Sequence, residues 1–212
     1  MIEYIIPHNP DDRVLKNASQ LLQEGKLICF PADTSWTLAA CCTNKDAIDK
    51  LYKIKKEDNQ KHFSLLCDSI SKASELAHID NQAFKLLKKT IPGHYTFIFE
   101  ATKKMAKYIQ ASKTDKEVGI RFIPIDYVQK IIEVHGEPLV CTNITNSILG
   151  ISEDDLTPIY SYQLEESISH LASMIIDPGE FEFVEPSTII DFVNDQVPAI
   201  IREGSGDISP FI

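Results

Sequence analysis

The chain has 212 residues, of which 43% are hydrophobic, enough for one substantial core, and this predicts a single domain over residues 1–212. No apolar run approaches the about 20 residues of a membrane-spanning helix, and no charged-then-apolar leader opens the sequence, so we expect a cytoplasmic protein without a membrane segment. The formal net charge of -10 is concentrated in the last third, where thirteen acidic residues from Gly150 onward stand against one basic residue, Arg202; this excludes a protein that coats nucleic acid with its whole surface but allows a local basic cleft.

Short apolar runs and amphipathic stretches alternate along the chain. The apolar runs predict strands at residues 3–6, 27–30, 37–42, 63–67, 95–99, 118–122 and 139–141, and near residues 174, 188 and 199. Apolar residues at helical spacing predict helices at 11–23, 44–54, 80–87, 127–134 and 164–171, with Asn44 and Asp80 as N-caps of the second and third. In the third helix, Phe84 is predicted to face the core. The alternation predicts a layered α/β domain in which crossover helices join at least some parallel strands.

The segment "PADTSW" places three polar residues after the predicted strand 27–30. Ligands of open α/β sheets bind outside strand ends, so Asp33, Thr34 and Ser35 could line a pocket with Trp36 as its flat apolar wall. The alternative is a polar turn next to a core tryptophan, and the segment by itself favours this alternative.

Two of the three arginines follow apolar strand residues. Arg121 in "VGIRF" and Arg202 in "AIIREG" each need an anionic partner near a buried strand end, either a carboxylate or a phosphate. For Arg202, an internal acid from the acidic last third is at least as good a partner as a ligand. Gly204 and Gly206 follow it, and their bare backbone could approach an anion.

Three other polar segments could contact a ligand or simply form surface. Lys55, Lys56 and Lys61 lie at the end of a mixed-charge helix or in the loop after it, from where an ammonium could reach a triphosphate. The hydroxyls of "EPSTIID", residues 185–191, could bind phosphate or close a turn. The polar residues after the strand "PLVC", 142–146, form either a loop or a binding rim.

The cysteines and histidines give no sign of a metal centre. The histidines are scattered without helical i, i+4 spacing, and no C-x-x-C pair occurs. We therefore expect reduced core cysteines and no protein-bound transition metal. The cysteines are Cys29, Cys41, Cys42, Cys67 and Cys141.

Taken in order, these segments resemble the YrdC/YciO family over nearly the whole chain. The family's G-x-x-x-x-x-P-T-D-T-x-Y-G-L is similar to "GKLICFPADTSWTL", and its I-K-x-R-x-x-x-K-P-L-S-L-L is similar to "IKKEDNQKHFSLL". Its P-G-x-x-T is matched by Pro92, Gly93 and Thr96, and its V-R by Arg121. Its P-S-T-I-x-D is matched by residues 186–191, and its R-x-G by Arg202 and Gly204.

The resemblance implies a three-layer α/β fold: a twisted, mostly parallel or mixed sheet flanked by helices, with a large, positively lined concave cleft. For the synthase branch it implies formation of threonylcarbamoyl-AMP from L-threonine, bicarbonate and ATP with Mg²⁺, releasing pyrophosphate, for tRNA modification. By resemblance, the catalytic residues are Lys55 and Arg202; the nucleotide-binding residues are Lys61, Asn143, Thr145, Ser187 and Arg202; and the residues on the threonine side are Thr34, Trp36 and Arg121.

The chain departs from the synthase motifs at four places. K-x-R becomes Lys55-Lys56-Glu57, which puts a repelling carboxylate where the arginine would favour an anion; S-x-N becomes Asn143-Ile144-Thr145, and Ala32 and Thr37 replace a threonine and a glycine. With "KHFSLLC" and "GEPLVCT", the departures make the YciO-like branch the closer resemblance. We expect weak or altered adenylation chemistry, with the alternative of a non-catalytic module that senses a nucleotide or binds tRNA or double-stranded RNA.

Overall fold

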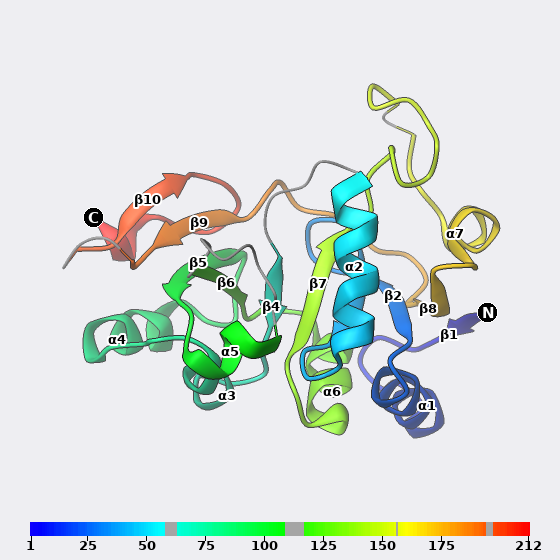
Figure 1. Ribbon diagram of the computed structural model, residues 1–212. Helices are drawn as coiled ribbons and strands as arrows, with labels where there is room; N and C mark the ends of the chain where they lie inside the picture. The colour runs from blue at the N-terminus through cyan, green and yellow to red at the C-terminus, as the bar shows by residue number, and fades with distance from the viewer. Residues whose placement is uncertain (58–62, 109–116, 156, 194–196) are drawn as a thin grey trace.

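The computed structural model describes residues 1–57, 63–108, 117–155, 157–193 and 197–212 (Figure 1). The strands are β1 (Ile2–Tyr4), β2 (Leu27–Pro31), β3 (Trp36–Cys41), β4 (Ser64–Leu66), β5 (Tyr95–Glu100), β6 (Glu117–Arg121), β7 (Leu139–Asn143), β8 (Ala172–Asp177), β9 (Thr188–Asp191) and β10 (Ala199–Arg202). The helices are α1 (Asp12–Gln23), α2 (Lys45–Glu57), α3 (Ile70–Leu76), α4 (Asn81–Thr90), α5 (Lys103–Tyr108), α6 (Asp126–His135) and α7 (Ser161–Ile168), and a 3₁₀ turn, η1 (Ser209–Phe211), ends the chain. No helix within these residues is long and apolar enough to cross a bilayer.

All the strands join one mixed sheet in the order β1-β8-β2-β3-β7-β4-β6-β5-β9-β10. The parallel pairs among the described strands are β1–β8, β2–β8, β4–β6 and β5–β9, and the other five pairs are antiparallel. The α/β sheet is therefore mixed, as predicted, but not mostly parallel. The reason lies in the short connections: residues 32–35 join β2 to β3, and so short a turn can only make an antiparallel pair.

The sheet separates two apolar clusters, as the alternation of side chains along β3 illustrates. Leu38 and Ala40 lie in the cluster that includes residues of α2, α4 and α7, whereas Ala39 and Cys41 lie in the cluster with α1 and α6. Helices thus cover both faces of the sheet, giving the three layers that were predicted.

One part of the sheet on the α1 and α6 side carries small or half-buried residues instead of core residues. Ser64 pairs with Cys141 of that side and with Gly119 of β6. A Cβ placed on Gly119 would lie 3.2 Å from Thr96 Cγ2 and 3.7 Å from Ser64 Oγ, so these three residues are neighbours on one face. We call this surface, formed by Ser64, Thr96, Ile98 and Gly119, the open sheet face.

The predicted helix caps are confirmed by hydrogen bonds. Asn44 Oδ1 accepts from the backbone N–H of Ala47 at 3.1 Å, and Asp80 Oδ1 accepts from that of Ala83 at 2.7 Å.

Two short helices, α3 and α5, were not predicted. Their seven and six residues are too few to show a helical period.

One predicted core residue of α4 is on the surface. Phe84 is 43% exposed, because the inward face of the helix is formed by Ala83, Leu87 and Thr90. The Lys88 ammonium lies 5.7 Å from the centre of the Phe84 ring, a distance typical of a cation–π contact.

The five cysteines are buried free thiols, as predicted. Burial raises the pKa of Cys42 to about 12 and also raises the pKa of Cys29 and Cys67. The thiols of Cys29, Cys42 and Cys67 therefore stay protonated and unreactive at neutral pH.

His135, the last residue of α6, is buried with an unsatisfied ring nitrogen. Its Nδ1 lies 3.4 Å from Ser19 Oγ, and among the described residues its Nε2 has no hydrogen-bond partner. Burial lowers the pKa of His135 below its ordinary 6.5, although the nearby Glu137 opposes this shift. Folding therefore favours the neutral ring.

The lowered pKa predicts a loss of stability in acid. The unfolded chain binds the His135 proton more readily, so the contribution of His135 is complete above the unfolded-state pKa of about 6.5 and is lost as the pH falls through the folded-state pKa. Urea unfolding at about pH 8 and about pH 5 should show a smaller pH dependence for His135→Gln than for the wild type. Equal pH dependence in the two proteins would contradict this origin.

Candidate functional site

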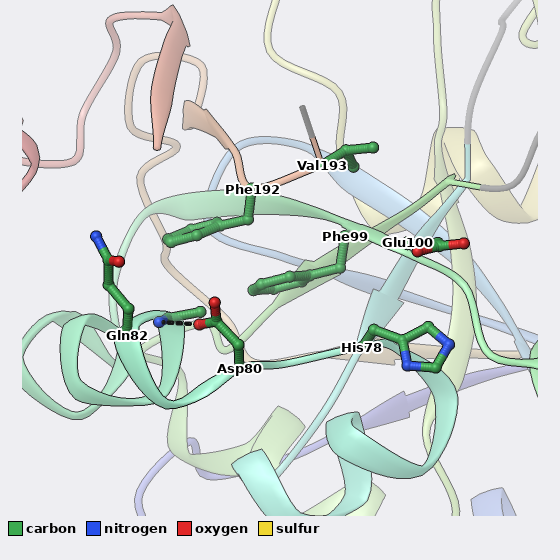
Figure 2. Close-up of a pocket in the computed structure, with 8 residues that line it drawn as sticks. His78, Asp80, Gln82, Phe99, Glu100, Phe192 and Val193 are labelled. Carbon is green, nitrogen blue, oxygen red and sulfur yellow. Dashed lines mark hydrogen bonds between the residues drawn. The ribbon is translucent and has the colours of Figure 1, made fainter. Parts of the chain in front are cut away.

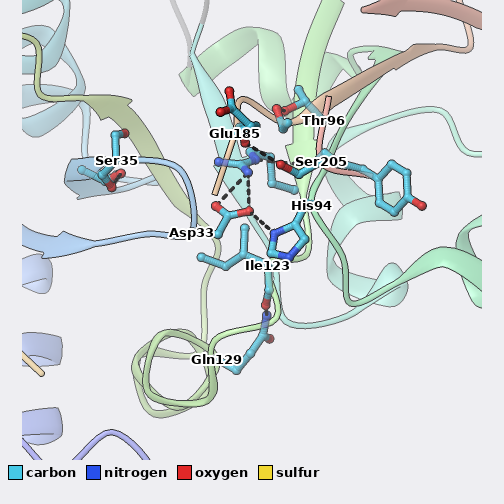
Figure 3. Close-up of polar contacts among 12 residues, drawn as sticks. Asp33, Ser35, His94, Thr96, Ile123, Gln129, Glu185 and Ser205 are labelled. Atoms are coloured by element: carbon cyan, nitrogen blue, oxygen red, sulfur yellow. Dashed lines mark hydrogen bonds and ion pairs between the residues drawn. The ribbon is translucent and has the colours of Figure 1, made fainter. Parts of the chain in front are cut away.

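The centre of the site is the buried carboxylate of Asp33, in the turn between β2 and β3. Arg121 Nη2, from the end of β6, donates to both Asp33 oxygens at 2.8 and 2.9 Å. His94 Nδ1 lies 3.0 Å from Asp33 Oδ2 (Figure 3), so Arg121 and His94 both contact this carboxylate oxygen. The carboxylate that Arg121 was predicted to need is thus Asp33.

Arg121 keeps part of its donor capacity after these contacts. Its Nε donates to the Tyr95 carbonyl at 3.3 Å, and its Nη1 has no hydrogen bond to the described residues. The side chain is only 6% exposed. Since Arg121 follows Gly119 by two positions in β6, it lies on the same side of the sheet as the open sheet face.

Backbone hydrogen bonds bring two other predicted segments to the Asp33 turn. The N–H of Val184 donates to the Asp33 carbonyl at 2.9 Å, and the N–H of Ile144 donates to the Trp36 carbonyl at 2.8 Å. The half-buried Thr34 therefore lies in a turn that contacts the segment leading to Ser187 and the segment from Asn143 to Thr145. The tertiary structure gathers these predicted residues around one turn.

Trp36 is a core residue, not the exposed wall of a pocket. It is 2% exposed, its indole N–H donates to the Ile159 carbonyl at 2.8 Å, and its ring meets the edge of Phe181 at 5.2 Å. The direction of its side chain explains the difference, because Trp36 points to the side of the sheet opposite the open sheet face. The structure therefore agrees with the alternative interpretation, a core tryptophan beside a polar turn.

Arg202 binds the backbone of the segment after Pro186. Its Nε and Nη2 donate to the Ser187 carbonyl at 3.0 and 2.7 Å, and Nη2 also lies 3.3 Å from Ser187 Oγ. The internal acid considered as its partner does not occur among these contacts. Ser187 Oγ lies 2.9 Å from Thr96 Oγ1, which links Arg202 to the open sheet face.

The glycines after Arg202 serve close packing instead of anion binding. The N–H groups of Gly204 and Gly206 both donate to Thr188 Oγ1 at 3.0 Å, so neither is available to a phosphate. A Cβ on Gly204 would lie 2.0 Å from the Pro186 carbonyl oxygen. An open hollow of about 390 Å³ remains here, lined by Glu185, Pro186, Arg202, Glu203, Gly204 and Ser205.

The predicted lysines lie at the limit of the described chain. Lys55, Lys56 and Glu57 end helix α2, but their side chains lie outside the described part, and Lys61 lies outside the described residues altogether. Their roles in phosphate binding stay predictions. Within the described residues, no three His, Cys, Asp or Glu side chains group in a way that could hold a metal ion.

The sequence did not indicate two contributors to the site. His94 was only one of six scattered histidines, and Thr188 was only one of two hydroxyls at a strand entrance. The motif P-G-x-x-T includes Thr96 and runs through His94, but it assigned a role in the site to neither residue. Contacts between residues far apart in the chain are needed to find both.

A separate hollow of about 170 Å³ lies beside the N-terminus of α4 (Figure 2). Its floor includes Phe99 and Phe192, whose rings stack with centroids 5.0 Å apart. The predicted site residues do not line it. The polar residues around it are His78, Asp80, Gln82 and Glu100.

Comparison with known proteins shows the family of the chain. The model of the Sua5/YciO/YrdC family, described as "Telomere recombination", matches residues 20–204. The uncharacterized protein YciO of Escherichia coli is 31% identical over 209 residues, which cover 99% of this chain and 98% of that protein. The crystal structure of E. coli YciO matches all of this chain and 99% of its own with a TM-score of 0.82.

A more distant structure shares the fold. The crystal structure of Pyrococcus abyssi Sua5 complexed with L-threonine has a TM-score of 0.79 at 22% identity. The match covers 96% of this chain but only 57% of the Sua5 chain. A P. abyssi protein named threonylcarbamoyl-AMP synthase is 23% identical over 90% of this chain. With the family model and the YciO match, these comparisons show that the chain is a member of the Sua5/YciO/YrdC family.

Proposed function

We propose that this protein carries out nucleotidyl transfer of the threonylcarbamoyl-AMP synthase type. L-threonine and bicarbonate would form a carbamate, whose oxygen attacks the α-phosphate of ATP and releases pyrophosphate. The observation that carries the proposal is the meeting of Arg121 and the 143–145 and 184–187 segments at the Asp33 turn, in a chain of a family that includes threonylcarbamoyl-AMP synthases.

Arg121 is the best candidate for the threonine carboxylate. Guanidinium groups bind carboxylates through several donors at once, and Arg121 has already fixed its orientation on Asp33 while Nη1 makes no hydrogen bond to the described residues. A rigid cation is a better substrate anchor than a mobile one because less conformational entropy is lost on binding. Thr34, in the same turn, would contact the same substrate.

Ser187 and Arg202 are the candidates for the nucleotide side, with Asn143 and Thr145 across the Asp33 turn. Arg202 borders the open hollow next to Ser187, where its charge would stabilise a phosphate. Lys55 and Lys61 would reach the triphosphate from the end of α2 and the loop after it. Mg²⁺ would enter with ATP as part of the substrate.

The chemistry needs positioning and positive charge, not a covalent nucleophile. Loss of one charge-assisted contact where negative charge develops commonly costs on the order of a hundredfold in rate. Glu57 in place of the arginine of K-x-R therefore predicts a slow reaction, or an altered amino-acid substrate. A cytoplasmic location and a link to tRNA modification are parts of the same proposal.

The second candidate function is a non-catalytic module that senses a nucleotide or binds tRNA or double-stranded RNA. Glu57 and the altered Asn143-Ile144-Thr145 favour it, because both changes fall on motifs of the synthase. Nucleotide sensing predicts ATP or AMP binding without turnover. RNA binding predicts an affinity that falls steeply with salt.

Pyrophosphate release tests the proposal directly. With ATP, Mg²⁺ and bicarbonate, we expect release that depends on threonine and that falls about a hundredfold in Arg202→Ala, because a cation beside the nucleotide is lost. Arg202→Lys keeps the positive charge but not the paired hydrogen bonds to the Ser187 carbonyl, so it shows which of the two matters. The control is Arg13→Ala, at an exposed arginine paired with Glu3. Bound ATP without release would favour the sensing module, and release unaffected by Arg202→Ala would overturn the role of Arg202.

A further inference from the structure

Asp33 fixes the proton position of His94. His94 Nδ1 lies 3.0 Å from Asp33 Oδ2, and the Asp33 side chain is 2% exposed whereas that of His94 is 31% exposed. A carboxylate can only accept hydrogen bonds, so Nδ1 carries the proton and Nε2 carries the free electron pair of the neutral ring. In Figure 3 the Asp33 and His94 side chains point toward one another, and Arg121 Nη2 donates to the same Oδ2 atom at 2.9 Å.

His94 is placed at the edge of the open sheet face. Tyr95 and Phe97 point into the core with Phe211, so alternation puts His94 on the side of Thr96. Its Nε2 makes no hydrogen bond to the residues that the structure describes. A partly exposed imidazole with a fixed tautomer and an open nitrogen, beside a buried guanidinium, is typical of a general base.

The proposed reaction needs such a group. The amine of an amino acid is an ammonium ion at neutral pH and has no electron pair with which to attack carbon. We propose that His94, oriented by Asp33, accepts a proton from the ammonium group of the amino-acid substrate; this inference rests on the proposed function. The N–H bond breaks, its electron pair stays on the substrate nitrogen, and the proton passes to Nε2.

The remaining steps balance without another reagent. The free amine attacks bicarbonate, a C–N bond forms, and water leaves, which gives the carbamate. A carbamate oxygen then displaces pyrophosphate from ATP. His94 returns its proton to solvent, which its exposed edge allows. The two partners of Asp33 also define the substrate class, an α-amino acid with a free carboxylate for Arg121 and a primary ammonium for His94.

The first test is the pH dependence of pyrophosphate release by His94→Asn. The asparagine amide can still donate to Asp33, but the side chain has no nitrogen that accepts a proton. We expect a rate at neutral pH about a hundredfold or more below the wild type. The wild-type rate should fall in acid as the base is protonated, and His94→Asn should lose this dependence. His170→Asn, at an exposed histidine next to α7, should behave as the wild type, and an unchanged profile in His94→Asn would overturn the proposal.

The second test needs no turnover and so separates this inference from the proposed function. Nitrogen NMR of ¹⁵N-histidine-labelled protein should show His94 with a proton on Nδ1 and none on Nε2. Threonine should shift the Nε2 signal, and N-acetylthreonine, which has no ammonium, should not. A protonated Nε2 in the neutral ring, or binding of threonine without a shift at Nε2, would overturn the role of His94 even if pyrophosphate is released. Absence of release with the expected shifts would refute the synthase activity alone.

Discussion

Asp33→Asn is expected to lower the free energy of unfolding by about 3–5 kcal/mol, because it leaves the buried Arg121 guanidinium without its counter-charge. Arg121 Nη2 donates to both Asp33 oxygens, and the two side chains are 6% and 2% exposed. Asparagine keeps the shape of the side chain but not its charge. Urea unfolding at neutral pH measures the difference.

Two variants control this result. Glu3→Gln breaks the pair between Glu3 and Arg13, whose side chains are 13% and 66% exposed, and should cost much less, because solvent screens the Arg13 charge. Combining Asp33→Asn with Arg121→Met removes both charges and should restore part of the lost stability. A loss below about 1 kcal/mol in Asp33→Asn would show that the pair is not the electrostatic support of the turn.

Gly204→Ala is expected to destabilise the protein by about 3 kcal/mol, the upper end of the usual cost of overpacking. The added Cβ would lie 2.0 Å from the Pro186 carbonyl oxygen and 2.8 Å from the Ser187 carbonyl carbon. Both are backbone atoms, so no flexible side chain can move aside. The segment that carries Ser187 must shift, which disturbs the hydrogen bonds of Arg202 to the Ser187 carbonyl.

The functional consequence of Gly204→Ala is a loss of nucleotide affinity, which calorimetry with ATP measures. Glu166→Ala, at an exposed position of α7 that does not line this hollow, is the control and should change stability by no more than about 0.5 kcal/mol. An alanine variant at Gly204 with the stability and ATP affinity of the control would contradict both the packing and the proposed nucleotide side.

The secondary structure was largely predictable because its signals are local. Polar caps such as Asp80, and apolar positions repeated at helical or strand spacing, act within a few residues, so they are visible in the sequence. Prediction failed where a helix was too short to show a period, as in α3, and where one residue lay beside the apolar stripe, as Phe84 does in α4. The parallel or antiparallel sense of each strand pair also depended on its neighbours in space.

The candidate site, too, was only partly predictable from the sequence. By itself the sequence determined the family, through motifs in a fixed order, and it named the segments around Thr34, Arg121, Ser187 and Arg202.

Only the tertiary structure decided what these residues bind. The partner of Arg121 is Asp33, 88 positions away, and Arg202 binds a backbone carbonyl that no side-chain pattern reveals. The Trp36 side chain lies in the core because the alternation of side chains along β3 points it to that face. His94 could be recognised as a site residue only from its contact with Asp33. Local propensity is encoded in neighbouring residues, whereas the pairing of buried charges depends on contacts between distant parts of the chain, which form only when the sheet assembles.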